Sequence, residues 1–256
     1  MRSGTDVVLG GTSRTFCHRL QDLRPKWVAG SLSHSDSIFL FEAARASRAR
    51  RAMEIGTGSG FSTTVLGHAL DTVAGAGGSE PDFQIATCDA QAAFYRDPSR
   101  RNGDAAREML PPRLLSRVRF VAPGNALDLR EQAAENSVGF LFIDANHRHP
   151  WPTLDLLALL PALAPGAVVV LHDINLPLLH PECTDWGAKY LFDDLAGEKA
   201  VPDDCPIPGI GSIRIPADKT EFHRQLWDVL MSHRWASDVP PAYLGRLGLK
   251  AAFGAG

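Results

Sequence analysis

Five short apolar runs, each followed by a segment of helical periodicity, constrain the fold of this chain most. The runs lie at Ala52–Ile55, Gln84–Cys88, Val118–Val121, Val138–Ile143 and Ala167–Leu171. Apolar runs of strand length that alternate with helices are typical of parallel strands joined by crossover helices, with both faces of the sheet covered. The pattern therefore predicts an α/β fold with a doubly wound, mostly parallel sheet.

The segments around these runs carry apolar residues at helical spacing. We expect helices at Phe61–Leu70, Ala126–Ala134, Thr153–Leu163 and Trp186–Leu195. A further helix, capped by Ser35 or Asp36, should precede the first run, and Ile210–Ile215 should form a late strand. The glycine-rich stretch Gly75–Pro81 is interpreted as a surface connection within the domain.

The length of the chain favours one domain with terminal additions. At 256 residues and 45% hydrophobic content, it can bury a substantial core. We expect a loosely structured lead-in or lid over residues 1–34, the main domain over 35–216, and a C-terminal helix and tail over 217–256. The stripe Phe222, Leu226 and Leu230 of that helix should pack on the sheet or against a second subunit, and a homodimer is slightly favoured.

Charge, cysteines and hydropathy exclude several classes of protein. The net charge of -3 provides no general attraction for a polyanion, so nucleic acid is not expected as a partner. The four cysteines at positions 17, 88, 183 and 205 form no C-x-x-C pair, which argues against structural zinc and a disulfide framework. No membrane-spanning run or signal peptide is evident, so we expect a soluble, cytoplasmic protein.

A glycine-rich loop directly follows the first apolar run and precedes a helix. Gly56, Gly58 and Gly60 would let the backbone turn tightly and approach a nucleotide-like ligand. The dinucleotide fingerprint G-x-G-x-x-G is not met, because Phe61 stands where its third glycine belongs. Glu54 should place a carboxylate beside the loop, which suits an amino-bearing ligand and repels a pyrophosphate. The loop therefore favours S-adenosylmethionine over NAD.

The run Met53–Ser62, M-E-I-G-T-G-S-G-F-S, resembles the first motif of the class I S-adenosylmethionine-dependent methyltransferases. Over about residues 36–215, the chain is most similar to their small-molecule O-methyltransferases, including the catechol type. The resemblance implies a Rossmann-like, seven-stranded sheet with helices on both faces. It also implies that Ser62 holds the methionine carboxylate and Asp89 the ribose hydroxyls, while Gly124-Asn125-Ala126 contacts the adenine. The expected cofactor-binding residues are Glu54, Gly56, Thr57, Gly58, Ser59, Gly60, Ser62, Asp89, Asn125, Ala126 and Asp144.

Polar clusters follow the fourth and fifth apolar runs, where an open parallel sheet binds its ligands. In catechol-type enzymes, an aspartate after strand four and an Asp-Asn pair after strand five hold a magnesium-like ion. Asp144 and Asp173 match the two aspartates, whereas Ile174 replaces the asparagine and Asn175 lies one place further on. The nearby histidines would also suit a transition metal. A divalent ion at Asp144 and Asp173 is therefore one prediction.

The general base of that family is a lysine three residues after the strand-four aspartate, and His147 takes its position here. An imidazole accepts a proton near neutral pH, so His147 is the predicted base, with His172 and His149 next in order. The resemblance implies methyl transfer to a hydroxyl of a small molecule such as a natural product, phenol or sugar. Two alternatives stay open: an N-methyltransferase, although the N-P-P-Y or D-P-P-Y signature is missing, and a cofactor-binding protein without transferase activity in a larger assembly.

Overall fold

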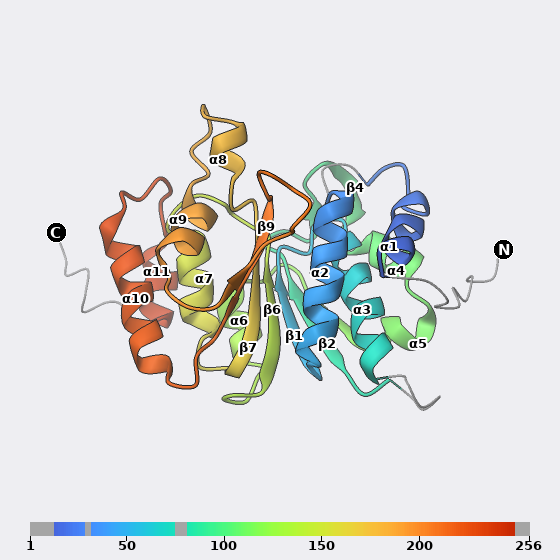
Figure 1. Ribbon diagram of the computed structural model, residues 1–256, viewed down its shortest axis with the longest axis horizontal. Helices are drawn as coiled ribbons and strands as arrows, with labels where there is room; N and C mark the ends of the chain where they lie inside the picture. Colours follow the sequence, from blue (N-terminus) through green and yellow to red (C-terminus); the bar gives the residue numbers. More distant parts are fainter. Residues whose placement is uncertain (1–12, 29–31, 75–80, 249–256) are drawn as a thin grey trace.

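A central sheet separates two groups of helices in the computed structural model, which describes residues 13–28, 32–74 and 81–248 (Figure 1). The strands are β1 (Arg51–Ile55), β2 (Gln84–Cys88), β3 (Ala93–Phe94), β4 (Asp97–Arg101), β5 (Val118–Val121), β6 (Val138–Ile143), β7 (Leu163–His172), β8 (Lys199–Ala200) and β9 (Ile210–Arg214). The helices are α1 (Ser13–Asp22), α2 (His34–Ser47), α3 (Phe61–Ala74), α4 (Asp104–Met109), α5 (Pro112–Leu115), α6 (Ala126–Arg130), α7 (Trp151–Leu159), α8 (Leu176–Leu179), α9 (Gly187–Asp194), α10 (Lys219–Ser232) and α11 (Pro241–Arg246).

The sheet has seven strands in the order β5-β2-β1-β6-β7-β9-β8. The pairs from β5 to β7 are parallel, while β9 runs antiparallel to both β7 and β8. This confirms the predicted Rossmann-like, mostly parallel seven-stranded sheet. The five apolar runs are the five parallel strands. β3 and β4 pair with each other in a separate hairpin, which the polar sequence around Asp97 did not predict.

Alternate residues of each central strand face opposite helical layers. In β6, Phe140 and Phe142 pack with α1 to α5, whereas Leu141 and Ile143 pack with α6, α7 and α9 to α11. Figure 1 shows these two layers on either side of the sheet. Because both faces are covered, the strands are apolar throughout rather than alternating between apolar and polar residues. Burying a side chain of this size contributes roughly 1.5 to 3 kcal/mol.

Residues 13–22 form a helix where the sequence interpretation expected a loosely structured lead-in. Phe16, Cys17 and Leu20 of α1 are buried in the core beside α2. The stripe is short and lies in a polar, glycine- and serine-containing segment, so its helical spacing was missed. The described part of the lead-in thus belongs to the packed domain, while residues 1–12 and most of the predicted connection Gly75–Pro81 lie outside the described residues.

The cap of α2 also differs from the prediction, by two or three residues. The N-cap is Ser33, whose hydroxyl oxygen accepts from the Asp36 backbone N–H, while the Asp36 carboxylate accepts from the Ser33 backbone N–H. This reciprocal capping box begins the helix at His34 rather than after Ser35 or Asp36. It also fixes the Asp36 carboxylate at the end of the helix nearest the cavity described below.

The C-terminal stripe is buried by the chain's own core. Phe222, Leu226 and Leu230 of α10 pack into the cluster that covers one face of the sheet, with Trp227 and Trp235 partly buried beside them. Packing on the sheet therefore accounts for this stripe, and the homodimer stays a prediction. No helix in the described ranges is both long and apolar enough to cross a lipid bilayer.

Candidate functional site

The parallel strands end level with one another at one edge of the sheet. Ile55, the last residue of β1, pairs with Cys88 of β2 and with Ile143 of β6. The residues that follow these strands therefore emerge side by side, as the topology of a parallel sheet requires. A cavity of about 680 Å³ lies at this edge, within the size range of small-molecule sites.

Most of the predicted cofactor residues line this cavity. They are Gly56, Thr57, Gly58, Ser59, Ser62, Asp89, Asn125 and Asp144. They come from the ends of β1, β2 and β6 and from the loop after β5, which places segments far apart in sequence around one space. The aromatic side chains of Tyr95 and Trp151 also line it, whereas Trp186 and Tyr190 stack on each other outside it.

The glycine loop takes a backbone shape that side chains would prevent. Gly56, Gly58 and Gly60 all have positive φ, at 96°, 48° and 90°. A Cβ atom on Gly56 would lie 1.9 Å from the Asp144 carbonyl oxygen, whereas one on Gly58 would meet nothing closer than Phe94 at 4.0 Å. The loop therefore packs tightly against β6 at its first glycine. At Gly58 the backbone leaves open space on the cavity side, as a loop that a ligand approaches closely requires.

Asp89 binds the glycine loop from the end of β2. One carboxylate oxygen accepts from the Gly58 N–H at 3.0 Å and the other from the Gln91 N–H at 3.2 Å. These bonds hold the carboxylate at the cavity wall without consuming all of its acceptor sites. The geometry suits the predicted role of Asp89 as acceptor for two ribose hydroxyl groups.

Glu54 does not face the cavity as the sequence interpretation expected. Its side chain is fully buried behind the glycine loop, where its carboxylate accepts from the Thr63 hydroxyl. Burial raises the pKa of Glu54 to about 7, against the opposing effect of the hydroxyls of Ser62, Thr63 and Thr87. Side chains alternate along β1, so a residue two positions before the loop points into a helical layer. Gly60 and Ala126 also lie outside the cavity lining.

This raised pKa predicts a pH-dependent stability that Glu54→Gln should remove. The folded state holds the proton more tightly than the unfolded state, so the wild type should lose stability as pH rises from about 4.5 to about 7. Relative to the wild type, Glu54→Gln should gain about 2 to 3 kcal/mol between pH 5 and pH 8. Urea unfolding at both pH values measures this difference. Parallel stability curves for the two proteins would contradict the prediction.

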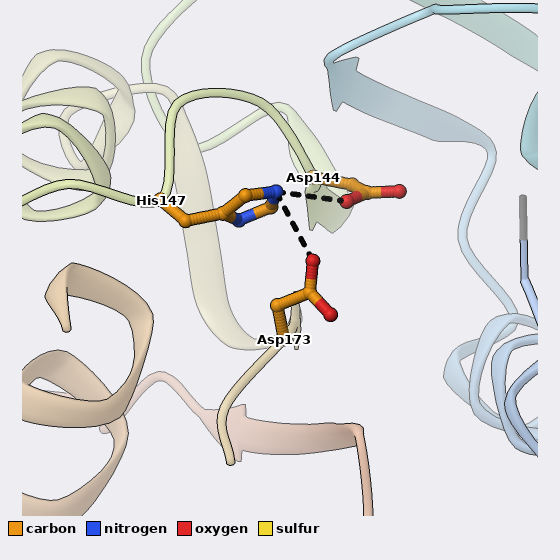
Figure 2. A group of neighbouring side chains, drawn as sticks. All are labelled: Asp144, His147 and Asp173. Atoms are coloured by element: carbon orange, nitrogen blue, oxygen red, sulfur yellow. Dashed lines mark ion pairs between the residues drawn. The ribbon is translucent and has the colours of Figure 1, made fainter. Parts of the chain in front are cut away.

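Three predicted catalytic and metal-binding side chains meet at the cavity (Figure 2). His147 Nε2 lies 3.1 Å from Asp173 Oδ2 and 3.9 Å from Asp144 Oδ1. Asp173 has a φ of 57°, a left-handed conformation that aspartate tolerates better than most residues and that is common at functional sites. The three residues come from the ends of β6 and β7 and from the loop after β6, as predicted.

His172 completes this cluster in a way that the sequence did not predict. Its Nδ1 lies 3.1 Å from Asp144 Oδ1 and 3.5 Å from Asp173 Oδ2, and its Nε2 lies 3.6 Å from Asp36 Oδ2. Burial alone would lower the pKa of His172, but the surrounding carboxylates raise it well above the ordinary value. The surrounding carboxylates thus favour the protonated form of His172, whose positive charge offsets theirs. Its contact with Asp36 joins α2 to the site.

The electrostatics of Asp173 follow from these neighbours. Burial would raise the pKa of Asp173, but the hydrogen bond from His172 and the positive charge of His172 and His147 outweigh burial and lower it. Asp173 is thus an ionised carboxylate at neutral pH. Its charge faces His147, where it would stabilise a protonated imidazole.

The same cluster has the composition of a cation site. Asp144, His147 and Asp173 each offer one ligand atom, and these atoms all lie within 4.8 Å of one another. Two carboxylate oxygens and one imidazole nitrogen suit a borderline transition-metal ion better than magnesium, which prefers oxygen ligands. Asn175 cannot contribute, because its side chain donates to the Pro208 carbonyl and accepts from Lys189. His147, rather than an asparagine, would therefore be the third ligand of a divalent ion at this site.

His149, the third candidate base, lies outside the cavity lining. Its side chain is fully buried, and one ring nitrogen lies 3.3 Å from the Leu230 carbonyl oxygen. Burial lowers the pKa of His149, so it is a neutral side chain that packs edge-on against the stacked rings of Tyr190 and His233. Of the three candidates, His147 and His172 are the ones that reach the site.

Comparison with known proteins agrees with this fold. A family model described as a methyltransferase domain matches residues 53–174, which run from β1 through the end of β7. No protein in the curated comparison matches the sequence.

Solved methyltransferase structures share the fold at low sequence identity. The O-methyltransferase TomG from Streptomyces achromogenes, in complex with S-adenosylmethionine, is 22% identical with a TM-score of 0.51, over 82% of this chain and 92% of TomG. A Bacillus cereus O-methyltransferase in complex with S-adenosylhomocysteine is 16% identical with a TM-score of 0.53, over 82% of this chain and 93% of its own. The S-adenosylhomocysteine-bound methyltransferase PaMTH1 from Podospora anserina is 15% identical with a TM-score of 0.52, over 80% and 88%.

The matched domain spans the glycine loop, Asp89, Asp144 and Asp173, and the sheet around them has the fold of the methyltransferase structures named above. Residues 53–174 therefore match a methyltransferase domain, and the chain has the fold of methyltransferases solved with S-adenosylmethionine or S-adenosylhomocysteine.

Proposed function

We propose that this enzyme transfers the methyl group of S-adenosylmethionine to a hydroxyl group of a small molecule such as a natural product, phenol or sugar. The observation that carries the proposal is the position of His147, an imidazole flanked by two carboxylates in the same cavity as the glycine loop. A hydroxyl is a poor nucleophile until its proton is removed, so a base at this position supplies what the reaction needs. TomG, with the same fold, is an O-methyltransferase involved in tomaymycin synthesis.

In this proposal the neutral imidazole of His147 takes the hydroxyl proton on the ring nitrogen that does not face Asp173, as the acceptor oxygen attacks the methyl group. The sulfonium then leaves as a neutral thioether, so the protein has mainly to orient the two reactants and remove a proton. Asp173, 3.1 Å from Nε2, stabilises the imidazolium that forms. His172 holds Asp144 and Asp173 in place from the other side, which makes it a positioning residue.

A divalent ion held by Asp144 and Asp173 would lower the pKa of the acceptor hydroxyl and fix its orientation. His147 Nε2 lies close enough to both carboxylates to serve as a third ligand. A neutral imidazole that binds an ion through Nε2 carries its proton on Nδ1, so it has no free nitrogen to accept the hydroxyl proton. Metal ligation and direct base catalysis by His147 are thus two distinct versions of the mechanism.

Turnover with a panel of small phenols and sugars, each paired with its amine analogue, tests the proposed reaction. We expect S-adenosylhomocysteine to form with a hydroxyl compound and not with the matched amine. Methylation of amines alone would contradict the O-methyltransferase proposal. Cofactor binding without turnover across a broad panel would favour the non-catalytic alternative.

Chelator treatment separates the two versions of the mechanism. With His147 as the direct base, activity should stay within about twofold after EDTA treatment and dialysis, because no step depends on the ion. Loss of activity that Mn²⁺, Co²⁺ or Mg²⁺ restores would show instead that the ion is required. Comparing these ions also tests the donor set, since one imidazole and two carboxylates favour Mn²⁺ or Co²⁺ over Mg²⁺.

A further inference from the structure

The cavity extends beyond the residues that the proposed reaction uses. His147, Asp144, Asp173 and His172 lie at one part of its wall. Another part is formed by the end of β2, the loops after β5 and β6, and the first turns of α7. The residues there are Cys88, Gly124, Asn125, Ala145, Trp151 and Asp155.

Asp155 is a buried polar residue in this second part of the cavity, and the proposed reaction does not explain its presence. It lies on α7, is 5% exposed, and lines the cavity among largely apolar neighbours. Among the described residues, its side-chain hydrogen bond comes from the Tyr243 hydroxyl of α11, at a long 3.5 Å to Oδ1. A buried carboxyl group with one weak partner is costly unless another donor satisfies it. The proposed methyl transfer gives Asp155 no role.

The cofactor's own shape places its base in this part of the cavity. In the proposed cofactor assignment, the glycine loop and Ser62 bind the amino-acid end and Asp89 binds the ribose. The base must then extend past Asp89, toward Gly124 and Asn125 on the next strand of the sheet. The Asn125 side-chain oxygen already accepts from the Leu127 N–H as the cap of α6. That bond holds the Asn125 side chain at the helix cap, whereas the Asp155 carboxyl at the same wall receives one long hydrogen bond among the described residues.

We propose that Asp155 accepts a hydrogen bond from the exocyclic amine of the cofactor's adenine and selects adenine over bases that carry an oxygen at that position. The inference rests on S-adenosylmethionine as the cofactor of the proposed function. The amine supplies the donor that the buried carboxyl lacks. A base with a carbonyl oxygen there would set two acceptors against each other, which a buried site rejects strongly.

The protonation of Asp155 determines the conditions of the test. Burial raises the pKa of Asp155 to about 7, against the opposing hydrogen bond from Tyr243. The neighbouring groups are Tyr243 and Cys88, and burial also raises the pKa of each of them above its ordinary value. A protonated carboxyl could donate to a carbonyl oxygen, whereas the ionised form only accepts. Discrimination between the two bases should therefore be measured at about pH 8.5, where Asp155 is ionised.

Calorimetry with S-adenosylhomocysteine and S-inosylhomocysteine tests the proposal. The wild type should bind the adenosyl compound about 10- to 100-fold more tightly. In Asp155→Asn the amide can donate to the inosine oxygen, so this preference should fall to about threefold or less. Tyr243→Phe is the matched control, because it perturbs the same buried pair but keeps the carboxyl, and should retain the preference. Because the two ligands are compared within one variant, a general loss of stability affects both affinities and does not change their ratio.

The outcomes separate this inference from the function on which it rests. Tight binding of S-adenosylhomocysteine with equal binding of the inosyl compound to the wild type would overturn the role of Asp155. The same preference in Asp155→Asn as in the wild type would also overturn it. Failure of the wild type to bind S-adenosylhomocysteine at all would overturn the cofactor assignment as well. If Asp155→Asn does not fold, Asp155→Ser should show the same loss of preference.

Discussion

Replacing His147 with alanine is expected to lower kcat by about 10²- to 10⁴-fold with little change in S-adenosylhomocysteine affinity. His147 lies 3.1 Å from Asp173 and lines the cavity, but it is not part of the glycine loop or of the Asp89 contacts. Loss of a base acts on the transition state and leaves cofactor binding in the ground state intact. Steady-state kinetics with an accepted hydroxyl compound, together with calorimetry, measures both quantities.

His223→Ala is the matched control for this variant. His223 is exposed on α10, away from the cavity lining, so its replacement should leave kcat within about twofold. Added imidazole should restore part of the activity of His147→Ala, since the truncated side chain leaves room for a small base in the cavity. Full activity of His147→Ala across the pH range would show that His147 is not the base, and His172 would become the next candidate.

Gly56→Ala should abolish cofactor binding, with S-adenosylhomocysteine affinity at least about 100-fold weaker. The added Cβ would lie 1.9 Å from the Asp144 carbonyl oxygen and 2.5 Å from its carbonyl carbon. Both atoms belong to the backbone, so relief requires the glycine loop or the end of β6 to move. The φ of 96° adds strain for any residue with a side chain. Calorimetry on the folded variant measures the loss.

Gly166→Ala is the control that distinguishes the effect of backbone strain from the steric overlap expected at Gly56. Gly166 also has a positive φ, at 78°, but nothing lies within 4 Å of the position of its Cβ. It lies near the start of β7, whereas the cavity lies at the other end of that strand. We expect Gly166→Ala to lose about 1 kcal/mol of stability and to bind the cofactor normally. Normal binding by Gly56→Ala would contradict the tight packing of the loop against Asp144.

The parallel sheet was predictable because its signal is local and repeated. Strands buried on both faces must be apolar along their whole length, as in Val138–Ile143, and each is followed by a helix with one apolar face. Helix α1 was not predictable in this way, since Phe16 and Leu20 form a short stripe in a polar segment. Its burial depends on α2 and α3, which supply the surface that it covers.

The site residues that could be predicted from the sequence are those that directly follow a strand. Asp89, Asp144 and Asp173 each follow a recognisable strand, so their meeting at one edge of the sheet could be deduced. Asp36 and Asp155 lie on helices, and the strand pattern says nothing about where their side chains point. The direction of the Glu54 side chain could not be predicted either, although Glu54 lies in a strand. Only the packing of β1 decides which helical layer this side chain enters.

The sequence by itself determined the order of the five parallel strands, the glycine loop that follows the first of them, and the polar side chains that end the parallel strands. These features depend on neighbours within a few residues, through backbone conformation and side-chain periodicity. Only the tertiary structure decided that His172 bridges Asp36, Asp144 and Asp173, that Asn175 turns away toward Lys189, and that Asp155 reaches the cavity wall. Contacts of this kind join residues far apart in the chain, and the packing of helices on the sheet fixes their distances and their charges.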